Sequence, residues 1–317
     1  MSLAQKEAVL AFLAERQGAM EALLEELVNI DSNSRDPEGV RRVGEAIVAF
    51  LNGQGVAAGF LETDGAPCVS ARIGPSANAG HVLLLGHMDT VFPAGEVAAR
   101  PFTKANGLAY GPGAADMKAG LVMNAFLMAA FQSAGGPPVP MVALFTTDEE
   151  IGTPGCRTLI EDHARGAGLV LNSEPGRVSG NIVSGRRGGT FFRATVIGKA
   201  AHAGLNPEDG RSAIGEMARK IVAWHSLSDD ARKISVNVGL ISGGQSVNTV
   251  APQCVADIDL RFADADEGER AAADIARIAS ACGTDGLTGS IETLGGFLPI
   301  VQNDVTRKAV DLYLEGA

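Results

Sequence analysis

The chain has 317 residues, of which 46% are hydrophobic and 20% are charged, and its formal net charge at pH 7 is -11. Nucleic acids and anionic membranes attract a basic face, so this acidic balance argues against both as the main partner. The length predicts two domains, each large enough to bury a hydrophobic core. The share of hydrophobic and charged residues is ordinary for a globular enzyme.

Up to about residue 185, strand-like and helix-like segments alternate. Strands are predicted at 56–62, 67–73, 81–86, 139–146 and 168–172, and helices at 4–30, 37–53, 117–133 and 155–164. This alternation predicts an α/β domain with a mostly parallel mixed sheet and flanking helices. The helix at 117–133 is apolar almost all round, so we expect its Met and Phe residues to lie in a core. No apolar run approaches the length of a membrane span.

From about residue 188 the pattern changes to strand, helix, two strands, helix and strand. The strands are predicted within 190–198, 233–242, 249–262 and 286–295, and the helices within 211–226 and 266–282. This βαββαβ order is that of a ferredoxin-like α+β sandwich. We therefore predict a first domain over 1–187, an inserted domain over 188–296, and the start of a return segment over 297–317.

The four cysteines, Cys68, Cys156, Cys254 and Cys282, are far apart and include no C-x-x-C pair. This spacing favours reduced structural thiols over disulfides or a thiolate metal site. The N-terminal stretch reads as an amphipathic helix without the apolar region of an export signal. We therefore expect a cytoplasmic protein, with an export signal removed upstream as the alternative.

Four short segments that carry acidic residues or histidine each follow an apolar, strand-like run. They contain His87 and Asp89, Asp116, Glu149 and Glu150, and Glu174. The carboxyl ends of the strands in an open α/β sheet line one crevice, so these side chains are expected in one cluster. One imidazole with several carboxylates suits a divalent ion such as zinc.

Each segment alone also has a structural interpretation. A histidine near an aspartate is commonly a satisfied core residue, Asp116 could cap the helix that follows it, and 148–150 could be a solvated charge run. These interpretations must hold independently at every place, whereas a metal site explains all four segments together. Because neighbouring side chains diverge, Glu149 and Glu150 can take different roles, one as a ligand and the other as a general base.

The segments GHMDTVFP, AYGPGAADMKAG, TTDEEIGTPG and NSEPGR resemble, in order and spacing, the four metal-site motifs of the dinuclear zinc exopeptidases. That family includes aminoacylase, acetylornithine deacetylase, succinyl-diaminopimelate desuccinylase and carboxypeptidase G. The resemblance extends over nearly the whole chain and is greatest to the glutamate carboxypeptidase branch. It implies a catalytic domain with an inserted lid or dimerisation domain, and two Zn2+ ions per chain in the full-length protein, with Co2+ or Mn2+ as substitutes.

The resemblance also implies a role for each matching metal ligand. Asp116 would bridge the two ions, and Glu150 would bind the first of them. His87 and Glu174 would bind the second ion. In the family the bridging aspartate is commonly followed by a cis peptide bond, which here would be Asp116–Met117.

Outside the ligands, Asp89 would orient the histidine ligand, and Glu149 would be the general base that activates water. In the inserted domain, His202 matches a histidine that reaches the active site of the partner subunit and helps to stabilise the oxyanion. Asn248 and Arg261 match contacts to the substrate carboxylate. From the residues alone, His202 is a surface histidine near a turn and Arg261 a solvated arginine at a strand end.

The chain departs from the family at one metal ligand. The family has a further histidine close to its C-terminus, a ligand of the first ion, and none of the five histidines here matches it. Asp116 and Glu150 alone are too few for a closed zinc site. We therefore expect the sequence to be a piece of a longer protein.

The predicted function is that of a zinc-dependent metallopeptidase or amidohydrolase. It would release a C-terminal amino acid, glutamate by preference, from N-acyl or peptidyl substrates that carry a free carboxylate. The nearest alternative is an N-acyl-amino-acid deacylase of the acetylornithine deacetylase or desuccinylase type. A non-catalytic dimeric binding module is the alternative of another class. We expect a homodimer through the inserted domain, and neither nucleic acid nor a membrane as partner.

Overall fold

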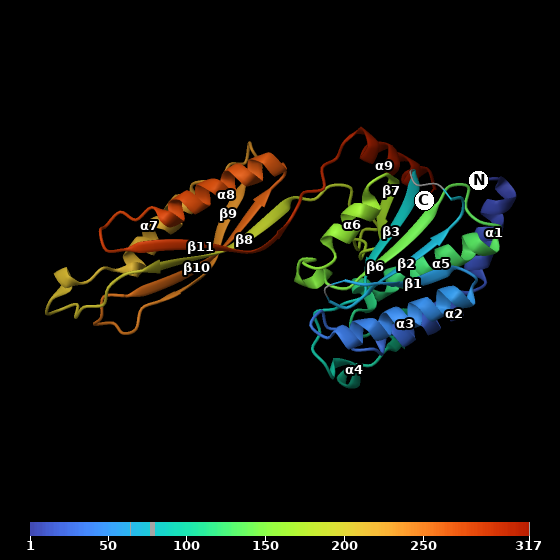
Figure 1. Cartoon of the computed structure of the whole chain (residues 1–317), viewed down its shortest axis with the longest axis horizontal. Coiled ribbons are helices and arrows are strands. Elements are labelled where there is room, and N and C mark those ends of the chain that lie inside the picture. Colours follow the sequence, from blue (N-terminus) through green and yellow to red (C-terminus); the bar gives the residue numbers. More distant parts are fainter. Residues whose placement is uncertain (64, 77–79, 317) are drawn as a thin grey trace. The chain divides into compact units, whose positions relative to one another are not determined.

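The computed structural model describes residues 1–63, 65–76 and 80–316 and divides into two compact units (Figure 1). Unit 1 is Met1–Asn181 and unit 2 is Ile182–Ala317, of which Ala317 lies outside the described residues. Each unit has its own sheet and its own hydrophobic core. The exact domain boundaries, including the return segment over 297–317, stay predictions.

Unit 1 contains a five-stranded mixed sheet in the order β1-β2-β6-β3-β7. Its strands are β1 Ala57–Leu61, β2 Cys68–Ile73, β3 His81–His87, β6 Met141–Thr146 and β7 Ala167–Asn172. Strand β3 pairs in parallel with β6 and β7, whereas β2 is antiparallel to both β1 and β6. Four strands therefore point one way and β2 the other, which confirms the mostly parallel mixed sheet.

Helices, a short hairpin and tight turns complete unit 1. The helices are α1 Leu3–Ala14, α2 Gln17–Val28, α3 Pro37–Gly53, α4 Glu96–Ala99, α5 Ala119–Ser133 and α6 Arg157–Ala164. The hairpin pairs β4 Thr103–Ala105 with β5 Leu108–Tyr110, and the turns are η1 Ala114–Lys118 and η2 Glu149–Ile151. The sequence pattern did not predict α4 or the hairpin, because both are short and the hairpin strands are exposed.

The prediction of one helix over 4–30 is wrong, because α1 and α2 are separate helices. The chain leaves the first helix at Glu15 and Arg16, which are not residues that usually break helices. Arg16 folds back instead: its Nη1 donates to the carbonyl of Phe12 at 3.2 Å, and its guanidinium carbon lies 3.7 Å from the Phe12 ring centroid. This side chain covers the end of α1.

The sheet of unit 1 has a hydrophobic core on both faces. Alternate residues of β6 face opposite ways: Ala143 and Phe145 join the cluster under α1, α2, α3 and α5, whereas Leu144 joins the cluster that contains Cys156 and residues of α6. All six residues of β6 are buried. A strand buried on both faces is expected to be almost continuously apolar, which explains the run MVALF before the buried Thr146.

The segment that joins η1 and α5 corrects the expectation that no apolar run is long enough to span a membrane. Within the described residues, Ala114–Ser133 is long and apolar enough to span a membrane by length and composition alone, although no such run was expected. In the structure 67% of its apolar window is buried, and core helices commonly pass the same test. Phe126 and Met128 are core residues as predicted, whereas Met123 is 64% exposed.

Unit 2 contains an antiparallel four-stranded sheet in the order β11-β8-β10-β9. Its elements are β8 Gly188–Ile197, η3 Pro207–Asp209, α7 Ala213–His225, β9 Ser235–Gly243, β10 Gln253–Phe262, α8 Ala265–Ser280, β11 Thr288–Phe297 and α9 Asp304–Gly316. Helices α7 and α8 pack with the sheet around Trp224. The chain order β8-α7-β9-β10-α8-β11 confirms the predicted βαββαβ pattern.

The strands of unit 2 alternate, unlike β6 of unit 1. In β10, Ile258 and Leu260 are buried in the cluster under the helices, whereas Asp257, Asp259 and Arg261 are only half-buried. Side chains along a strand point alternately to the two faces, so these charged residues share the face opposite the helices.

Candidate metal centre

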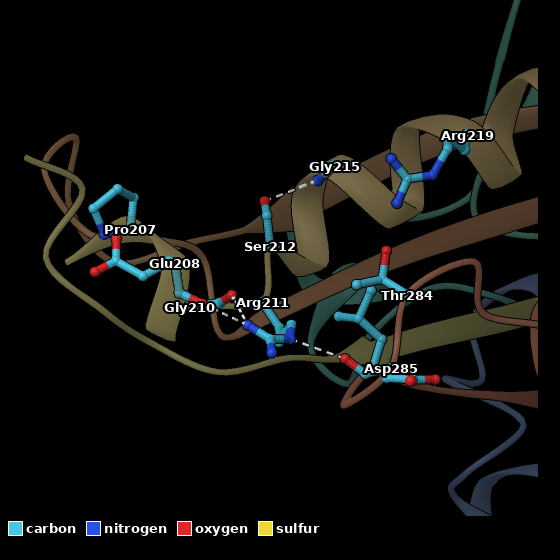
Figure 2. Close-up of a pocket in the computed structure, with 10 residues that line it drawn as sticks. Pro207, Glu208, Gly210, Arg211, Ser212, Gly215, Arg219, Thr284 and Asp285 are labelled. Atoms are coloured by element: carbon cyan, nitrogen blue, oxygen red, sulfur yellow. Dashed lines mark hydrogen bonds between the residues drawn. The ribbon is translucent and has the colours of Figure 1, made fainter.

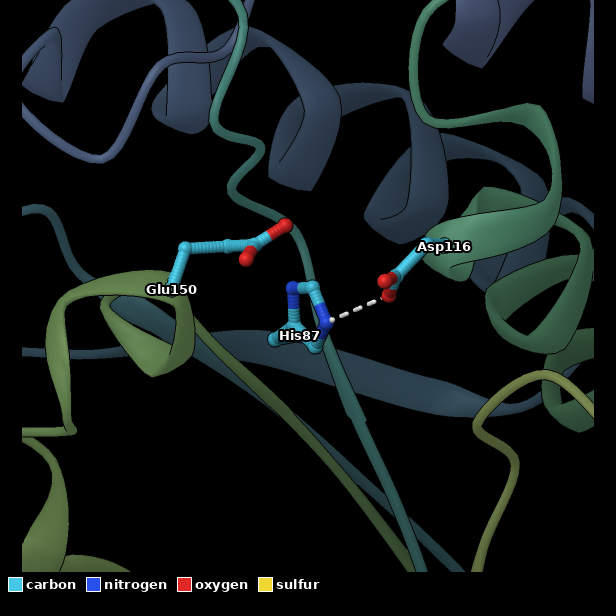
Figure 3. Close-up of side chains that lie close together, drawn as sticks. All are labelled: His87, Asp116 and Glu150. Atoms are coloured by element: carbon cyan, nitrogen blue, oxygen red, sulfur yellow. Dashed lines mark ion pairs between the residues drawn. The ribbon is translucent and has the colours of Figure 1, made fainter. Parts of the chain in front are cut away.

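The metal-ligand candidates of unit 1 surround His87, the last residue of β3. Its side chain is 2% exposed, yet its Nε2 atom has no hydrogen-bond partner among the described residues. Carboxylate oxygens lie near Nε2, at 3.3 Å for Asp116, 3.6 Å for Glu174 and 3.8 Å for Glu149. Figure 3 shows the ring between the carboxylates of Asp116 and Glu150. A buried nitrogen without a partner, surrounded by anions, fits a bound cation.

Asp89 holds the other side of the His87 ring. Its Oδ1 lies 3.3 Å from Nδ1, and its backbone carbonyl lies 3.0 Å from the same nitrogen. The carboxylate is fully buried and accepts hydrogen bonds from the Ser34 hydroxyl at 2.6 Å and from the backbone N–H groups of Glu149 and Glu150 at 3.2 Å each. Asp89 therefore fixes the ring and the two glutamates together.

The environment of His87 determines what its Nε2 can bind. Burial lowers the pKa of His87, but the hydrogen bond with Asp89 and the charges of Asp89, Glu174 and Glu149 raise it to about 9. The Nδ1–H group of His87 donates to Asp89, which leaves the lone pair of Nε2 for a proton or a metal ion. A cation at Nε2 would replace that second proton.

Asp116 lies in η1, the turn that leads into α5, and its peptide bond to Met117 is cis. This confirms the bond geometry implied by the resemblance. The Met117 sulfur accepts the backbone N–H of His87 at 3.1 Å. The buried Lys118 donates to two carbonyl oxygens near the end of α2, at 2.9 and 2.8 Å. The turn is thus fixed to β3 and α2, while the Asp116 side chain stays 58% exposed.

Glu149 and Glu150 open η2, which is separated from the end of β6 by two residues. Asp148 secures the far end of this loop, because its Oδ2 accepts the backbone N–H groups of Gly155 and Cys156. Burial raises the pKa of Glu150, and the charge of His87 opposes this increase. The loop therefore presents two glutamates whose backbone positions are fixed at both ends.

Glu174 follows β7 and completes the cluster. Burial raises its pKa, the charge of His87 lowers it, and the carboxylates of Glu149 and Asp116 raise it again, to about 7. Carboxylates that lie this close together repel one another when ionised, so they tend to bind either protons or a divalent cation.

Two groups of three side chains offer ligand atoms that all lie within 4.8 Å of one another. One is His87, Asp116 and Glu150, and the other is His87, Glu149 and Glu174. Their membership differs from the assignment implied by the resemblance, which pairs His87 with Glu174 and leaves Glu149 unliganded as a base. The structure brings all five side chains together, and their individual roles stay predictions.

His202 and Asn248 lie beside each other in unit 2. The segments that carry them are joined by an isolated bridge between His202 and Thr249 and by a hydrogen bond from the Ala203 N–H to the Asn248 carbonyl at 2.9 Å. His202 is exposed, and its Nδ1 accepts the backbone N–H of Gly204 at 3.2 Å. The structure therefore brings together two of the three residues predicted in this unit.

Arg261 belongs to a separate cluster on the polar face of the unit 2 sheet. Its Nε donates to Asp259 at 2.7 Å, and its guanidinium carbon lies 5.2 and 5.3 Å from the ring centroids of Phe191 and Phe297. Gly189 is paired with both Arg261 and Phe297, and a Cβ there would come within 3.1 Å of the guanidinium. The glycine leaves the space in which the arginine lies.

Unit 2 also contains a hollow of about 450 Å³ near the start of α7 (Figure 2). Arg211 lines it and donates to three backbone carbonyl oxygens at 2.7 to 2.9 Å. Arg219, a second lining residue, is paired with Glu216 at 2.6 Å. Because the protein itself holds both guanidinium groups, we assign this hollow a structural role.

Three residues that hold the centre were missed by the sequence analysis. They are Ser34, which contacts Asp89, Lys118, which fixes the Asp116 turn, and Asn124, which contacts Ser173 beside Glu174. Asn124 did have a signal, because it is a polar residue within the apolar helix sequence AGLVMNAFLMAAF. Ser34 had none, because only the folded chain brings it to Asp89.

Two family models match the chain. The peptidase dimerisation domain matches residues 184–283, and peptidase family M28 matches residues 69–191. The first covers most of unit 2, and the second covers the part of unit 1 that carries His87, Asp116 and Glu174.

Curated relatives agree with these matches. The chain is 31% identical over 268 residues to carboxypeptidase G2 of Pseudomonas sp. (strain RS-16), which covers 83% of this chain and 65% of the relative. It is 28% identical over 258 residues to acetylornithine deacetylase of Myxococcus xanthus, covering 74% of this chain and 65% of the relative. The chain thus spans about half to two thirds of the length of the curated relatives it matches.

Solved structures share the fold. Aminopeptidase PepT from Bacillus cereus ATCC 10987 aligns with a TM-score of 0.73 at 21% identity, over 92% of this chain and 81% of that one. An M20 family metallo-carboxypeptidase, Sso-CP2 from Sulfolobus solfataricus, aligns with a TM-score of 0.70 at 19% identity, over 93% and 82%. At these identities the likeness shows the fold alone.

Proposed function

We propose that this chain, which belongs to the M20/M28 zinc peptidase family and carries a peptidase dimerisation domain, is a metal-dependent hydrolase of C-terminal amide bonds. It releases a C-terminal amino acid, by preference glutamate, from N-acyl or peptidyl substrates. The observation that carries this proposal is the buried Nε2 of His87, which lacks a hydrogen-bond partner and faces carboxylates from three loops.

The residues of the centre fit a divalent ion at His87. In this proposal a second ion binds at Asp116 and Glu150, and the full-length protein supplies the further ligand that this second site needs. Bound there, zinc would polarise the scissile carbonyl and make water a nucleophile at neutral pH. Asp89 keeps Nε2 of His87 directed at the carboxylates through its contact with Nδ1. Glu149 takes the proton from water, since its side chain is 45% exposed and its backbone is held by Asp89.

The polar face of unit 2 supports the preference for glutamate. The guanidinium carbon of Arg186 lies 4.5 Å from the ring centroid of Phe297, and that of Arg261 lies 5.3 Å from the same centroid. Two cations held by one aromatic ring suit a ligand with two carboxylates, as a C-terminal glutamate has. In this proposal Asn248 also contacts the substrate, and His202 stabilises the oxyanion.

A hydrolysis screen tests the proposal. Zinc-loaded full-length protein is given N-acyl and dipeptide substrates that end in Glu, Asp, Ala or Leu, and the released amino acid is measured. We expect Glu to be released fastest and a chelator to abolish release. A fully metal-loaded protein that hydrolyses none of these substrates contradicts the proposal.

Arg186 can be tested separately. A charged hydrogen bond contributes about 1.5–3 kcal/mol, so Arg186→Ala should lower the preference for Glu over Ala about 10- to 100-fold. Arg193→Ala is the matched control, because Arg193 lies on a neighbouring part of the same sheet and is paired with Asp257 at 2.8 Å. An unchanged preference in Arg186→Ala removes Arg186 from the substrate site.

The similarity to acetylornithine deacetylase of Myxococcus xanthus favours a deacylase as the second candidate. A deacylase would depend on the acyl group and accept several amino acids, so the same screen separates the two. Turnover of either kind also excludes a non-catalytic binding module.

The dimerisation domain leads us to propose a homodimer through unit 2. Strand β9 is an edge of the sheet, and it carries Leu240 and Ile241 at 67% and 56% exposure. On α7, Val222 is 71% exposed. Exposed apolar residues on a sheet edge and a helix of the same unit fit a two-fold, self-complementary interface.

A mixed dimer tests whether His202 acts across that interface. Dimers of His202→Ala or Glu149→Ala chains alone should be inactive. In a heterodimer of the two, one site would receive both intact residues and should regain turnover. If His202 serves its own chain, every site lacks one group and no activity returns, and an active monomer would also contradict the proposal.

A further inference from the structure

Asn124 is a buried polar residue in an otherwise apolar helix. Its surface is 2% exposed, and its neighbours on α5, such as Leu121, Ala125 and Met128, are buried hydrophobic residues. Burying an amide costs free energy unless its donors and acceptor are hydrogen-bonded. An apolar residue at this position would therefore be buried at a lower free energy cost, unless the amide has a role.

Both ends of the Asn124 amide are hydrogen-bonded. Its Nδ2 donates to the Leu85 carbonyl at 3.2 Å, and its Oδ1 accepts the Ser173 hydroxyl at 2.7 Å. The orientation is unambiguous, because exchanging the two ends would set Oδ1 against a carbonyl oxygen. The backbone N–H of Ser173 also donates to the Leu85 carbonyl, at 3.2 Å. Asn124 thus joins the ends of two strands.

These strand ends carry two of the metal-ligand candidates. Leu85 stands two residues before His87 on β3, and Ser173 directly precedes Glu174 after β7. The pairing of β3 with β7 stops at Leu85 and Asn172, whereas β3 remains paired with β6 as far as His87. Beyond Leu85, the sheet itself does not fix Glu174 to His87.

Helix α5 approaches the Ser173 backbone closely enough to hold it. A Cβ on Gly120 would lie 2.1 Å from the Ser173 carbonyl oxygen, so only glycine allows this contact. Asn124 stands one turn further along the same helix and reaches the Ser173 side chain. The Nε2 of His87 and the Oε1 of Glu174 are 3.6 Å apart in this arrangement.

We propose that Asn124 is a positioning residue that ties the Ser173 loop to the end of β3, so that Glu174 and His87 reach the same metal ion. This inference rests on the metal site of the proposed function. Outer hydrogen bonds of this kind orient ligands, and their loss typically weakens metal binding about 10- to 100-fold. Asn124 touches neither substrate nor metal in this role.

Metal binding without substrate tests the role. The full-length protein is stripped of metal and titrated with Zn2+ against a chelating dye, and with Co2+ while its visible absorption is recorded. Asn124→Leu keeps the side-chain volume but removes both hydrogen bonds, and Ser173→Ala removes one of them. We expect about 10- to 100-fold weaker binding of one ion in each variant, with an altered Co2+ spectrum.

Two controls separate positioning from stability. Ser173→Thr keeps the hydroxyl and should bind metal as the wild type does. Met128→Ala removes a fully buried side chain one turn along α5 from Asn124 and should lower the melting temperature without weakening metal binding. The Asn124→Leu, Ser173→Ala double variant should be no weaker than the worse single variant, because both remove one shared contact.

Wild-type metal affinity in both Asn124→Leu and Ser173→Ala overturns the inference. Equal metal loss in Met128→Ala also overturns it, because binding would then follow stability alone. A wild type that binds metal but hydrolyses nothing overturns only the proposed function. A wild type that binds no metal overturns both.

Discussion

The two units use their sheets in different ways. In unit 1 the central strands β3 and β6 are buried on both faces, and the polar residues of interest gather where β3, β6 and β7 end. In unit 2 the helices pack on one face, and charged residues such as Asp257, Asp259 and Arg261 lie on the other. A doubly covered sheet leaves only its strand ends for chemistry, whereas a singly covered sheet offers a whole face.

The strand ends of unit 1 give the largest expected effect. Glu149→Ala should lower kcat about 10²- to 10⁴-fold, the usual contribution of a general base, while the protein keeps its metal. Glu150→Ala should reduce the bound metal as well. Metal content by elemental analysis, measured beside turnover, separates the two roles. Near-normal turnover in a metal-loaded Glu149→Ala protein would show that the assignment is wrong.

The doubly covered sheet predicts a large packing effect in unit 1. Leu144 on β6 is fully buried, so Leu144→Ala should lower the free energy of unfolding by about 2–5 kcal/mol. Urea unfolding followed by circular dichroism measures this change. A loss below 1 kcal/mol would mean that the core around β6 tolerates the missing volume.

The covered face of unit 2 predicts a pH-dependent effect. Glu216 is 3% exposed; burial raises its pKa, but hydrogen bonds from Arg219 and Gly283 and the charge of Lys220 lower it overall below 4.5. The pKa of Glu216 is lower in the folded protein than in the unfolded chain. The contribution of its carboxylate to the free energy of unfolding is therefore complete above the unfolded-state pKa, and it is lost as the pH falls through the folded-state pKa.

Glu216→Gln should therefore destabilise the protein by about 1.5–3 kcal/mol at pH 7, because the buried Lys220 loses its counter-charge. The difference from the wild type should shrink as the pH falls below about 4.5, where the wild-type carboxyl becomes neutral too. Unfolding curves between pH 7 and 3 test this, with the exposed Glu269→Gln as control. A difference that stays constant with pH would exclude the ionised carboxylate as its cause.

The polar face of unit 2 predicts the smallest effect. Asp257 accepts two hydrogen bonds from Arg193 at 2.8 Å each, but the two side chains are 23% and 48% exposed. Exposed ion pairs contribute about 0.2–1 kcal/mol, so Asp257→Ala should change the free energy of unfolding by no more than that. A decrease in the free energy of unfolding of more than 2 kcal/mol would show that this polar face stabilises unit 2 strongly. The contrast with the buried strand β6 would then be weaker.

The same contrast explains how much of the fold could be predicted. The unbroken run of β6 and the alternation in β10 are visible in the sequence, because each follows from burial on two faces or on one. The break between α1 and α2 was not visible, because the chain leaves the helix at Glu15 and Arg16, and neither is a residue that usually breaks helices. The cytoplasmic location remains a prediction from the cysteine spacing.

The candidates His87, Glu149, Glu150 and Glu174 could be predicted because they lie at or just after the ends of β3, β6 and β7, and parallel strands end at one edge. Asp116 follows the exposed hairpin instead and reaches the same place from the turn before α5.

The residues that hold the ligand candidates could not be predicted, because their contacts join distant parts of the chain. Ser34 reaches Asp89 across 55 residues, and Ser173 reaches Asn124 across 49. The cis peptide bond after Asp116 could be predicted only from the resemblance of the motifs to a known family, because no residue pattern alone indicates it.

The buried carboxylate of Asp89 also determines how the site opens. It accepts hydrogen bonds from the Ser34 hydroxyl and from the backbone N–H groups of Glu149 and Glu150. If either segment moves away, the buried carboxylate loses hydrogen bonds, and the free energy cost of keeping its charge buried rises. These segments should therefore open together, as one cooperative unit. In hydrogen exchange the amides of Glu149 and Glu150 would exchange at matched rates, and a cation at His87 would slow both by the same factor.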